Sequence, residues 1–144
     1  MPLVIRTLVH ATPDYAAAIA LRRAILRTPL GLDFTPGQLS AEASDIHLAG
    51  FDEDALIATV VLTPYDATTF KLRQMAVAET HQGRAIGAEM LMTAETTARA
   101  RGAKRILLAA RMSAAGFYSR HGYQIQGEPY IEVTLPHITM WKDL

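Results

Sequence analysis

The sequence predicts a mixed α/β fold, in which one sheet lies between helices, and three observations support it. The chain has 144 residues, which leaves room for about one domain. Half of the residues are hydrophobic, enough to bury a core without disulfides or metals. Strand-like segments come first and then alternate with helical ones, an order typical of a sheet covered by helices. We therefore expect a single domain over residues 1–144.

The first elements along the chain are a strand and a helix. A strand is expected over Leu3–His10, and Thr12 precedes a proline as a hydroxyl N-cap does at a helix start. The helix is expected over Pro13–Arg27. The prolines and glycines of Thr28–Gln38 make that segment irregular, and a short second helix should follow near Gln38–Ala43.

The middle of the chain reads as three antiparallel strands followed by a long helix. Ile46–Phe51 and Ala55–Thr63 form a hairpin pattern, and Phe70–Val77 is a third strand. Ala85–Arg101 has apolar residues every three or four positions, the spacing of a helix that lies on a sheet. Gly102 provides a C-terminal stop for that helix.

The last third completes the sheet. Ile106–Ala110 is apolar on both faces, as expected for a strand that is covered on two sides, and Ser113–His121 reads as a further helix. Tyr123–Gly127 and Tyr130–Trp141 supply the final β segments.

The charge balance and the missing cysteines exclude several classes of protein. Lys and Arg (14) equal Asp and Glu (14), so no overall field attracts nucleic acid or an anionic membrane. Without cysteine the chain forms no disulfide, no thiolate metal site and no cysteine acyl intermediate. No apolar run approaches the ~18 residues that span a bilayer, and the first residues lack a signal-peptide pattern. We expect a cytoplasmic protein with no nucleic-acid and no membrane partner.

Histidine is the other common metal ligand. His10, His47, His81 and His121 fall in separate predicted elements, without i, i+4 pairing or a nearby carboxylate motif. We therefore expect no metal.

The segment with the clearest chemistry is a strand ending in Met75-Ala76-Val77, followed by a loop that ends Gln82-Gly83-Arg84-Ala85-Ile86-Gly87 at a helix start. The first turn of a helix leaves about four N–H groups unpaired and carries roughly +0.5 charge, so it can bind and neutralise a pyrophosphate. Gly83 and Gly87 would let the backbone approach that ligand. Arg84 would add a charge-assisted contact, or is an ordinary surface arginine.

From Leu72 to Tyr123 the chain resembles the GCN5-related N-acetyltransferase (GNAT) family. The acetyl-CoA loop of that family follows the pattern Q/R-x-x-G-x-G/A, which Gln82, Gly83, Arg84, Ile86 and Gly87 fit. Ala85 departs from it, since the family usually has its first glycine there. The resemblance implies a mostly antiparallel central sheet flanked by helices, and acetyl-CoA as co-substrate on Met75, Ala76, Val77 and Gln82–Gly87.

A second block carries the resemblance further. Ser113–Tyr123 is similar to the family segment A-x-x-F/L-Y-x-x-x-G-F/Y, which makes Tyr118 the implied proton donor to the leaving thiolate. Arg111 stands seven residues earlier, where many members have Asn, and is counted among the cofactor contacts. The ending Leu135–Met140 looks like a subgroup of small acetyltransferases whose last strand reads I/L-P-H-x-x-M. The alternative for Tyr118 is a core tyrosine whose hydroxyl bonds to backbone.

The family reaction is direct attack of an amine on the thioester while both substrates are bound. The attacking amine must be neutral, yet with a pKa of about 10.4 only about one alkylamine in 10³ is neutral at pH 7. The strand Phe70–Val77 has no carboxylate to act as a base, so Glu132, His137 or water remain as candidates. Alternatively, Glu132 pairs with Arg111, and His137 caps a strand end behind Pro136.

The resemblance says little about the acceptor. Arg22, Arg23 and Arg27 either form a solvated helix face or meet an anionic acceptor, and Asp33 and Phe34 lie in a loop that often walls the acceptor site in the family. The expected function is acetyl transfer to a primary amine of a small molecule by a monomer or homodimer. The alternatives are a non-catalytic module that binds CoA or another phosphate ligand, and a protein N-acetyltransferase.

Overall fold

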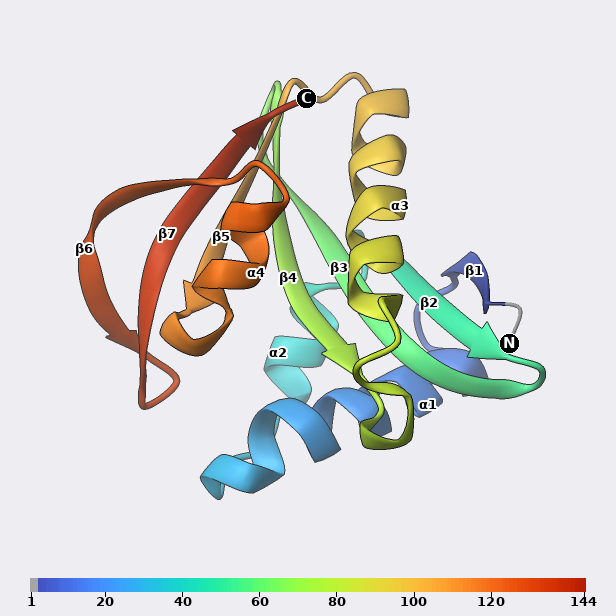
Figure 1. The fold of residues 1–144 in the computed structure, drawn as a ribbon. Helices are drawn as coiled ribbons and strands as arrows, with labels where there is room; N and C mark the ends of the chain where they lie inside the picture. The colour runs from blue at the N-terminus through green and yellow to red at the C-terminus, as the bar shows by residue number, and fades with distance from the viewer. Residues whose placement is uncertain (1–2) are drawn as a thin grey trace.

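Seven strands form one sheet in the order β1-β2-β3-β4-β5-β7-β6 in the computed structural model, which describes residues 3–144 (Figure 1). The strands are β1 (Leu3–Leu8), β2 (Ile46–Asp52), β3 (Ala55–Asp66), β4 (Thr69–Val77), β5 (Arg105–Arg111), β6 (Gln124–Glu132) and β7 (Leu135–Asp143). Neighbouring strands are antiparallel except β4 and β5, which run parallel. The predicted mixed, mostly antiparallel sheet is confirmed.

The helices cover both faces of this sheet. They are α1 (Pro13–Arg22), α2 (Pro36–Ala41), α3 (Ile86–Ala100) and α4 (Ala115–Arg120). Shorter turns are a π-helix over Arg23–Arg27 and 3-10 turns over Thr28–Leu30, Glu79–His81 and Met112–Ala114. Among the described residues, no helix is both long enough and apolar enough to cross a membrane.

Several predicted boundaries are confirmed and others move. Thr12 caps α1 by accepting a hydrogen bond from the Tyr15 N–H, but the expected helix over Pro13–Arg27 changes to a π-helix after Arg22. The expected strand Tyr123–Gly127 is too short, because β6 continues to Glu132. Pro129 has no N–H to donate to a neighbouring strand. It is tolerated because β6 is the edge strand and bulges between Gln126 and Tyr130.

Alternation of side chains along β2 gives the sheet two different buried faces. Leu48 packs with Leu62, Leu72 and residues of α3 in the larger cluster, whereas Ala49 joins Ala18 of α1 in the smaller one. Successive residues of a strand point to opposite faces, so α3 and α1 cover opposite sides of the sheet. Figure 1 shows this arrangement around β3.

The sheet opens at its centre. β4 and β5 pair only between Thr69–Leu72 and Arg105–Leu108, and Figure 1 shows the two strands diverging beyond that point. β4 also bulges where Gln74 and Met75 together oppose one residue of β3, and Gln74 has a φ of 57°. Side chains from both faces of the sheet therefore border the space between the diverging strands.

Candidate active site

The divergent ends of β4 and β5 border a cavity of about 400 Å³, which we call the central cavity. Because β4 and β5 alternate like any strands, Leu72 and Leu108 line it from the α3 face, and Lys71 and Ala109 line it from the α1 face. Its full lining is Leu26, Arg27, Gln38, Lys71, Leu72, Arg73, Gln74, Met75, Leu108, Ala109, Ala110, Arg111, Ala114, Tyr118, Glu132, Val133 and His137. The cavity therefore connects the two sides of the sheet.

A second cavity of about 300 Å³ lies at the N-terminal end of α3, and we call it the loop cavity. It is lined by Val77, His81, Gln82, Gly83, Ala85, Ile86, Gly87, Ala88 and Phe117. Phe117 lines the loop cavity and the next residue, Tyr118, lines the central cavity, so α4 contributes to both. The predicted loop residues thus gather around one hollow, apart from Arg84.

The loop before α3 presents unpaired amides. No backbone carbonyl of the described chain accepts a hydrogen bond from the N–H groups of residues 83–88, and no side chain caps α3. Gly83 has a φ of 77° and no other atom within 4 Å of the position a Cβ would take. The Gln82 amide donates to the Val77 carbonyl at 2.9 Å, which ties the loop to the end of β4. This geometry suits an anionic ligand such as a diphosphate.

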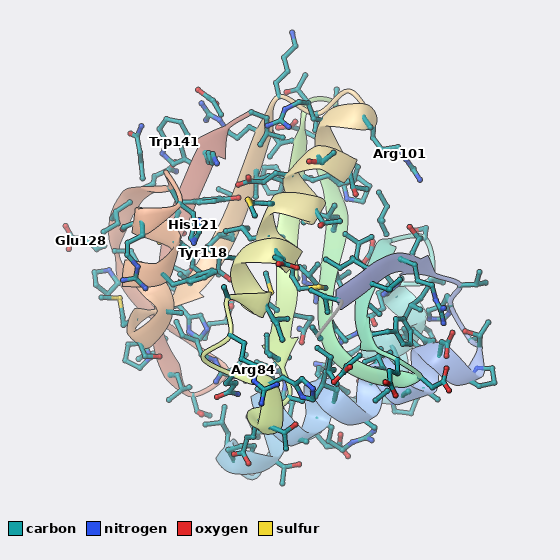
Figure 2. All side chains as sticks on the ribbon, turned by 45° about the vertical axis from the view of Figure 1, so that its right-hand side comes forward. Arg84, Arg101, Tyr118, His121, Glu128 and Trp141 are labelled. Carbon is teal, nitrogen blue, oxygen red and sulfur yellow. The ribbon has the colours of Figure 1, made fainter. Side chains whose placement is uncertain are left out.

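Arg84 lies at the surface beside the loop cavity. Arg84 is exposed at the loop end of α3, and Figure 2 shows it at the opposite end of that helix from Arg101. Arg84 is thus free to reach a bound anion from solvent, which fits either interpretation given by the sequence.

Ala85 differs from the expectation of a helical residue. It is the N-cap of α3 and adopts the left-handed conformation, with a φ of 61°. A residue with a Cβ is disfavoured there by roughly 1–2 kcal/mol, whereas glycine adopts it freely. This local strain explains in physical terms why a glycine is favoured at this position of the loop.

Replacing Ala85 by glycine is expected to raise the free energy of unfolding by about 0.5–1 kcal/mol, because relief of the left-handed strain exceeds the entropy that glycine adds to the unfolded chain. Urea denaturation measures the change. Ala88→Gly is the matched control, since the same substitution inside the first turn of α3 should lower stability by roughly 0.5–1 kcal/mol. Equal losses in both variants would contradict the strain at Ala85.

Tyr118 is buried, and its hydroxyl has no hydrogen-bond partner in the described part of the chain. Its side chain is 7% exposed and lines the central cavity, and no group within residues 3–144 bonds to its hydroxyl. Figure 2 shows Tyr118 on α4, on the side toward α3. Burial raises the pKa of Tyr118 to about 12, so its hydroxyl stays protonated at neutral pH. Tyr118 is part of the larger hydrophobic cluster, as the alternative of a core tyrosine expected, but its hydroxyl does not bond to backbone among residues 3–144.

Glu132 and His137 meet at the other end of the central cavity, on β6 and β7. The His137 Nδ1 lies 2.8 Å from the Leu135 carbonyl and donates a hydrogen bond to it, which leaves Nε2 as the ring nitrogen outside this bond. That Nε2 lies 4.0 Å from the Glu132 carboxylate. His137 is buried and Glu132 is half exposed. The structure therefore brings both candidate bases and Tyr118 to one cavity.

Arg111 lies in the central cavity and not in the loop cavity. It donates a hydrogen bond of 2.9 Å to the Leu26 carbonyl of the π-helix. The alternative in which Glu132 pairs with Arg111 is not observed in the described chain: Arg111 bonds to the Leu26 carbonyl, and Glu132 lies 4.0 Å from the His137 Nε2. The role of Arg111 as a cofactor contact remains a prediction.

The three arginines of the first helix have three different environments. Arg22 is 1% exposed and forms a bidentate ion pair with the buried Glu42, so it is neither a solvated residue nor an acceptor contact. Arg23 pairs with Asp33 at the surface. Arg27 lines the central cavity, and Phe34 lies under its guanidinium at 4.5 Å.

Glu42 fixes α1 against the end of α2. Burial alone would raise the pKa of Glu42, but hydrogen bonds from Arg22 and Tyr15 lower it below the ordinary value. The pair lies next to the π-helix and so holds the wall that contributes Leu26 and Arg27 to the central cavity.

Sequence reasoning missed Lys71, Arg73 and Gln74 as cavity residues. Lys71 and Arg73 flank the buried Leu72, so alternation along the strand places them together on the opposite face, and that signal was available. Gln74 could not be predicted as a cavity residue from the sequence, because its position depends on the bulge in β4. The Gln74 Oε1 is buried without a hydrogen-bond partner among residues 3–144.

No group of three or more His, Cys, Asp or Glu side chains with a metal-binding arrangement is found among the described residues. His10 and His47 pack around Tyr15, with ring centroids 6.0 Å apart, and each bonds to a backbone carbonyl.

Comparison with known sequences gives a consistent result. Residues 12–123 match the family described as "Acetyltransferase (GNAT) family". The chain is 31% identical over 74 residues to "Uncharacterized N-acetyltransferase YjcF" of Bacillus subtilis (strain 168), a match that covers 51% of this chain and 53% of YjcF. It is 26% identical over 131 residues to "Uncharacterized N-acetyltransferase YitI" of the same organism, which covers 86% of this chain and 88% of YitI. The first match thus spans only about half the length of its relative.

A comparison with solved structures agrees. A GNAT family acetyltransferase from Elizabethkingia anophelis, solved with acetyl-CoA bound, matches 99% of this chain and 98% of its own chain at 19% identity and a TM-score of 0.76. This likeness confirms the predicted fold.

Proposed function

The chain belongs to the acetyltransferase (GNAT) family, and from that premise we propose that it transfers the acetyl group of acetyl-CoA to a primary amine of a small molecule. The observation that carries this proposal is the pair of adjoining cavities, one with unpaired amides and one with an unbonded buried tyrosine. A volume of about 400 Å³ is within the range of small-molecule sites, which supports a small acceptor over a protein one.

The loop residues fit the charged part of acetyl-CoA. The N–H groups of residues 83–88 would hold the diphosphate, with the positive end of α3 behind them. Gly87 lines the loop cavity beside Phe117 of α4, and an added Cβ would lie 3.6 Å from that ring, so the backbone here is open to a ligand. Backbone N–H groups of Met75–Val77, beyond the last pair of β4 with β5, would stabilise the charge on the carbonyl oxygen.

The side chains of the central cavity would move the protons. The acceptor nitrogen forms a bond to the acetyl carbon as the carbon–sulfur bond breaks, giving an amide and free CoA. Glu132 or His137 would take the proton that the nitrogen loses, directly or through water. Tyr118 would give its proton to the leaving sulfur. Because the site is desolvated, a thiolate formed there would be a stronger base than in water, which favours this transfer.

Release of free thiol tests the function. The purified chain is incubated with acetyl-CoA and a panel of amines, polyamines, aminoglycosides and peptide N-termini, and thiol is measured against the rate of hydrolysis without amine. Acceleration by at least one small amine is expected. A non-catalytic binding module would bind CoA and accelerate with none, and a protein acetyltransferase would respond to the peptides alone.

The pH profile of turnover distinguishes the two candidate bases. His137→Ala is expected to remove the limb in which the rate rises between about pH 6 and 7, because histidine is the side chain that ordinarily titrates in this range. Glu132→Gln is the paired variant and should retain that limb at a lower rate, since it removes a neighbour of His137. An unchanged profile in His137→Ala would transfer the role to Glu132 or to water.

A further inference from the structure

The central cavity holds more positive charge than its carboxylates balance. Arg27, Lys71 and Arg111 line it, and none of them has a carboxylate within 4.0 Å among residues 3–144. Arg73 lines it too and has Asp45 at 3.8 Å. Glu132 is the carboxylate in the lining, and it lies 4.0 Å from the His137 Nε2. Three cations without a directly paired carboxylate thus face one small volume, in which Glu132 is the one acidic residue of the described lining.

Two of these cations are held side by side. Arg27 Nη1 and Arg111 Nη2 donate to the same oxygen, the Leu26 carbonyl, at 3.1 and 2.9 Å. Each guanidinium has five N–H donors in a fixed fork, so most of their donors remain for another partner. Phe34 covers one face of Arg27 and so restricts its orientation. Such a pair is preorganised for a carboxylate or a phosphate.

Placing two guanidiniums together has an electrostatic cost. Burial lowers the pKa of Arg27, and the nearby charges of Arg111, Arg22 and Arg73 lower it further, against a smaller opposing effect of Glu132. A bound anion between Arg27 and Arg111 would offset this repulsion. Two half-buried arginines, Arg27 of the π-helix after α1 and Arg111 of β5, meet on one oxygen. This geometry suits an anion-binding subsite.

This pair lies apart from the loop that would hold the diphosphate. Arg111 follows Ala110 on β5, and Ala110 packs in the cluster with α3, so Arg111 points to the opposite face. Arg27 and Arg111 line the central cavity and neither lines the loop cavity. Their partner is therefore expected on the acceptor, on the far side of the sheet from α3.

We propose that the acceptor amine carries an anionic group, a carboxylate or a phosphate, which Arg27 and Arg111 bind while the amine faces Glu132, His137 and Tyr118. This proposal rests on the proposed function and narrows its substrate class. Lys71 would add a third positive charge to the same subsite.

Matched pairs of amines test it. β-Alanine is compared with β-alaninamide, and O-phosphoethanolamine with ethanolamine, by thiol release from acetyl-CoA and by calorimetric titration of each amine into CoA-saturated protein. The wild-type chain is expected to prefer an anionic member at least about tenfold, as bonds to charged groups typically give. Whichever pair shows the larger preference distinguishes carboxylate from phosphate recognition.

Variants locate the subsite. Arg27→Gln and Arg111→Gln should raise the KM for the anionic amine at least about tenfold and leave the KM for acetyl-CoA unchanged. Arg111→Lys keeps the charge and should restore part of the preference. Arg99→Gln removes the same charge from an exposed position of α3 and should change neither constant.

The outcomes separate this inference from the proposed function. Equal acetylation of charged and neutral amines by the wild type, or no binding of either anionic amine, would overturn the inference. In either case, acetylation of the neutral amines would still support the proposed function. A rise in the KM for acetyl-CoA in the glutamine variants would also overturn it, because the arginines would then contact CoA. If an anionic amine binds through Arg27 and Arg111 but no thiol is released, the anion-binding subsite is supported and the proposed function is contradicted.

Discussion

Replacing Gly87 by glutamate is expected to abolish binding of acetyl-CoA, with a loss of affinity of at least about 100-fold. Gly87 lies in the first turn of α3 and lines the loop cavity. A carboxylate there would occupy the place of the diphosphate and repel its charge at close range, where Coulomb energies are several kcal/mol at an effective dielectric of about 20. Isothermal calorimetry with acetyl-CoA measures the change.

The fold should tolerate this substitution. An added Cβ at Gly87 meets only Phe117, at 3.6 Å and 3.8 Å, an ordinary contact. An acidic side chain in the first turn of a helix is stabilising by typically 0.3–1 kcal/mol, and replacing a helical glycine adds about as much. Loss of binding with an unchanged or higher melting temperature is therefore expected. Thr96→Glu, which adds the same charge at an exposed site of α3, is the control and should bind normally. Unaltered affinity of Gly87→Glu would refute the placement of the diphosphate.

Tyr118→Phe is expected to lower kcat by about 100-fold or more, the usual range for loss of a general acid, while the affinity for acetyl-CoA changes little. Phenylalanine keeps the ring contacts with Phe117 and Tyr123, whose centroids lie 5.1 and 5.6 Å away. Only the hydroxyl, which has no partner in the described chain, is removed. Steady-state thiol release with a saturating amine measures kcat.

The pH dependence gives an independent check on Tyr118. Because burial raises its pKa to about 12, the phenol stays mostly protonated up to about pH 11, so the acid should remain available and no large decline from Tyr118 should appear below that pH. Tyr123→Phe is the matched control: it removes a buried hydroxyl bonded to Glu95 at 2.9 Å, outside the cavities, and should lower stability but not kcat. A fully active Tyr118→Phe variant would make this tyrosine a packing residue.

Local signals in the sequence predicted most of the elements. Thr12 before a proline marked the start of α1, and Gly102, with a φ of 85°, marked the end of α3. The apolar spacing of α3 and the strand-loop-helix order before it were enough to place the loop cavity. These features depend on short-range geometry, which a single sequence contains.

The rest depended on contacts between distant segments. Arg22, Arg23 and Arg27 look alike in sequence, yet Glu42, Asp33 and the central cavity give them different environments. The left-handed conformation of Ala85 and the bulge at Gln74 arise where the chain is constrained by neighbouring elements, and neither residue type favours them. The environments of these arginines, and that of Gln74 in the central cavity, were therefore beyond sequence reasoning, whereas the residues of the loop cavity were not.

A crystal structure of the protein with acetyl-CoA tests the central claim most directly. The account predicts the diphosphate on the N–H groups of residues 83–88 and the thioester between the diverging ends of β4 and β5, with its sulfur within hydrogen-bonding distance of the Tyr118 hydroxyl. Acetyl-CoA bound elsewhere, or a thioester out of reach of Tyr118 and the Met75–Val77 amides, would contradict it.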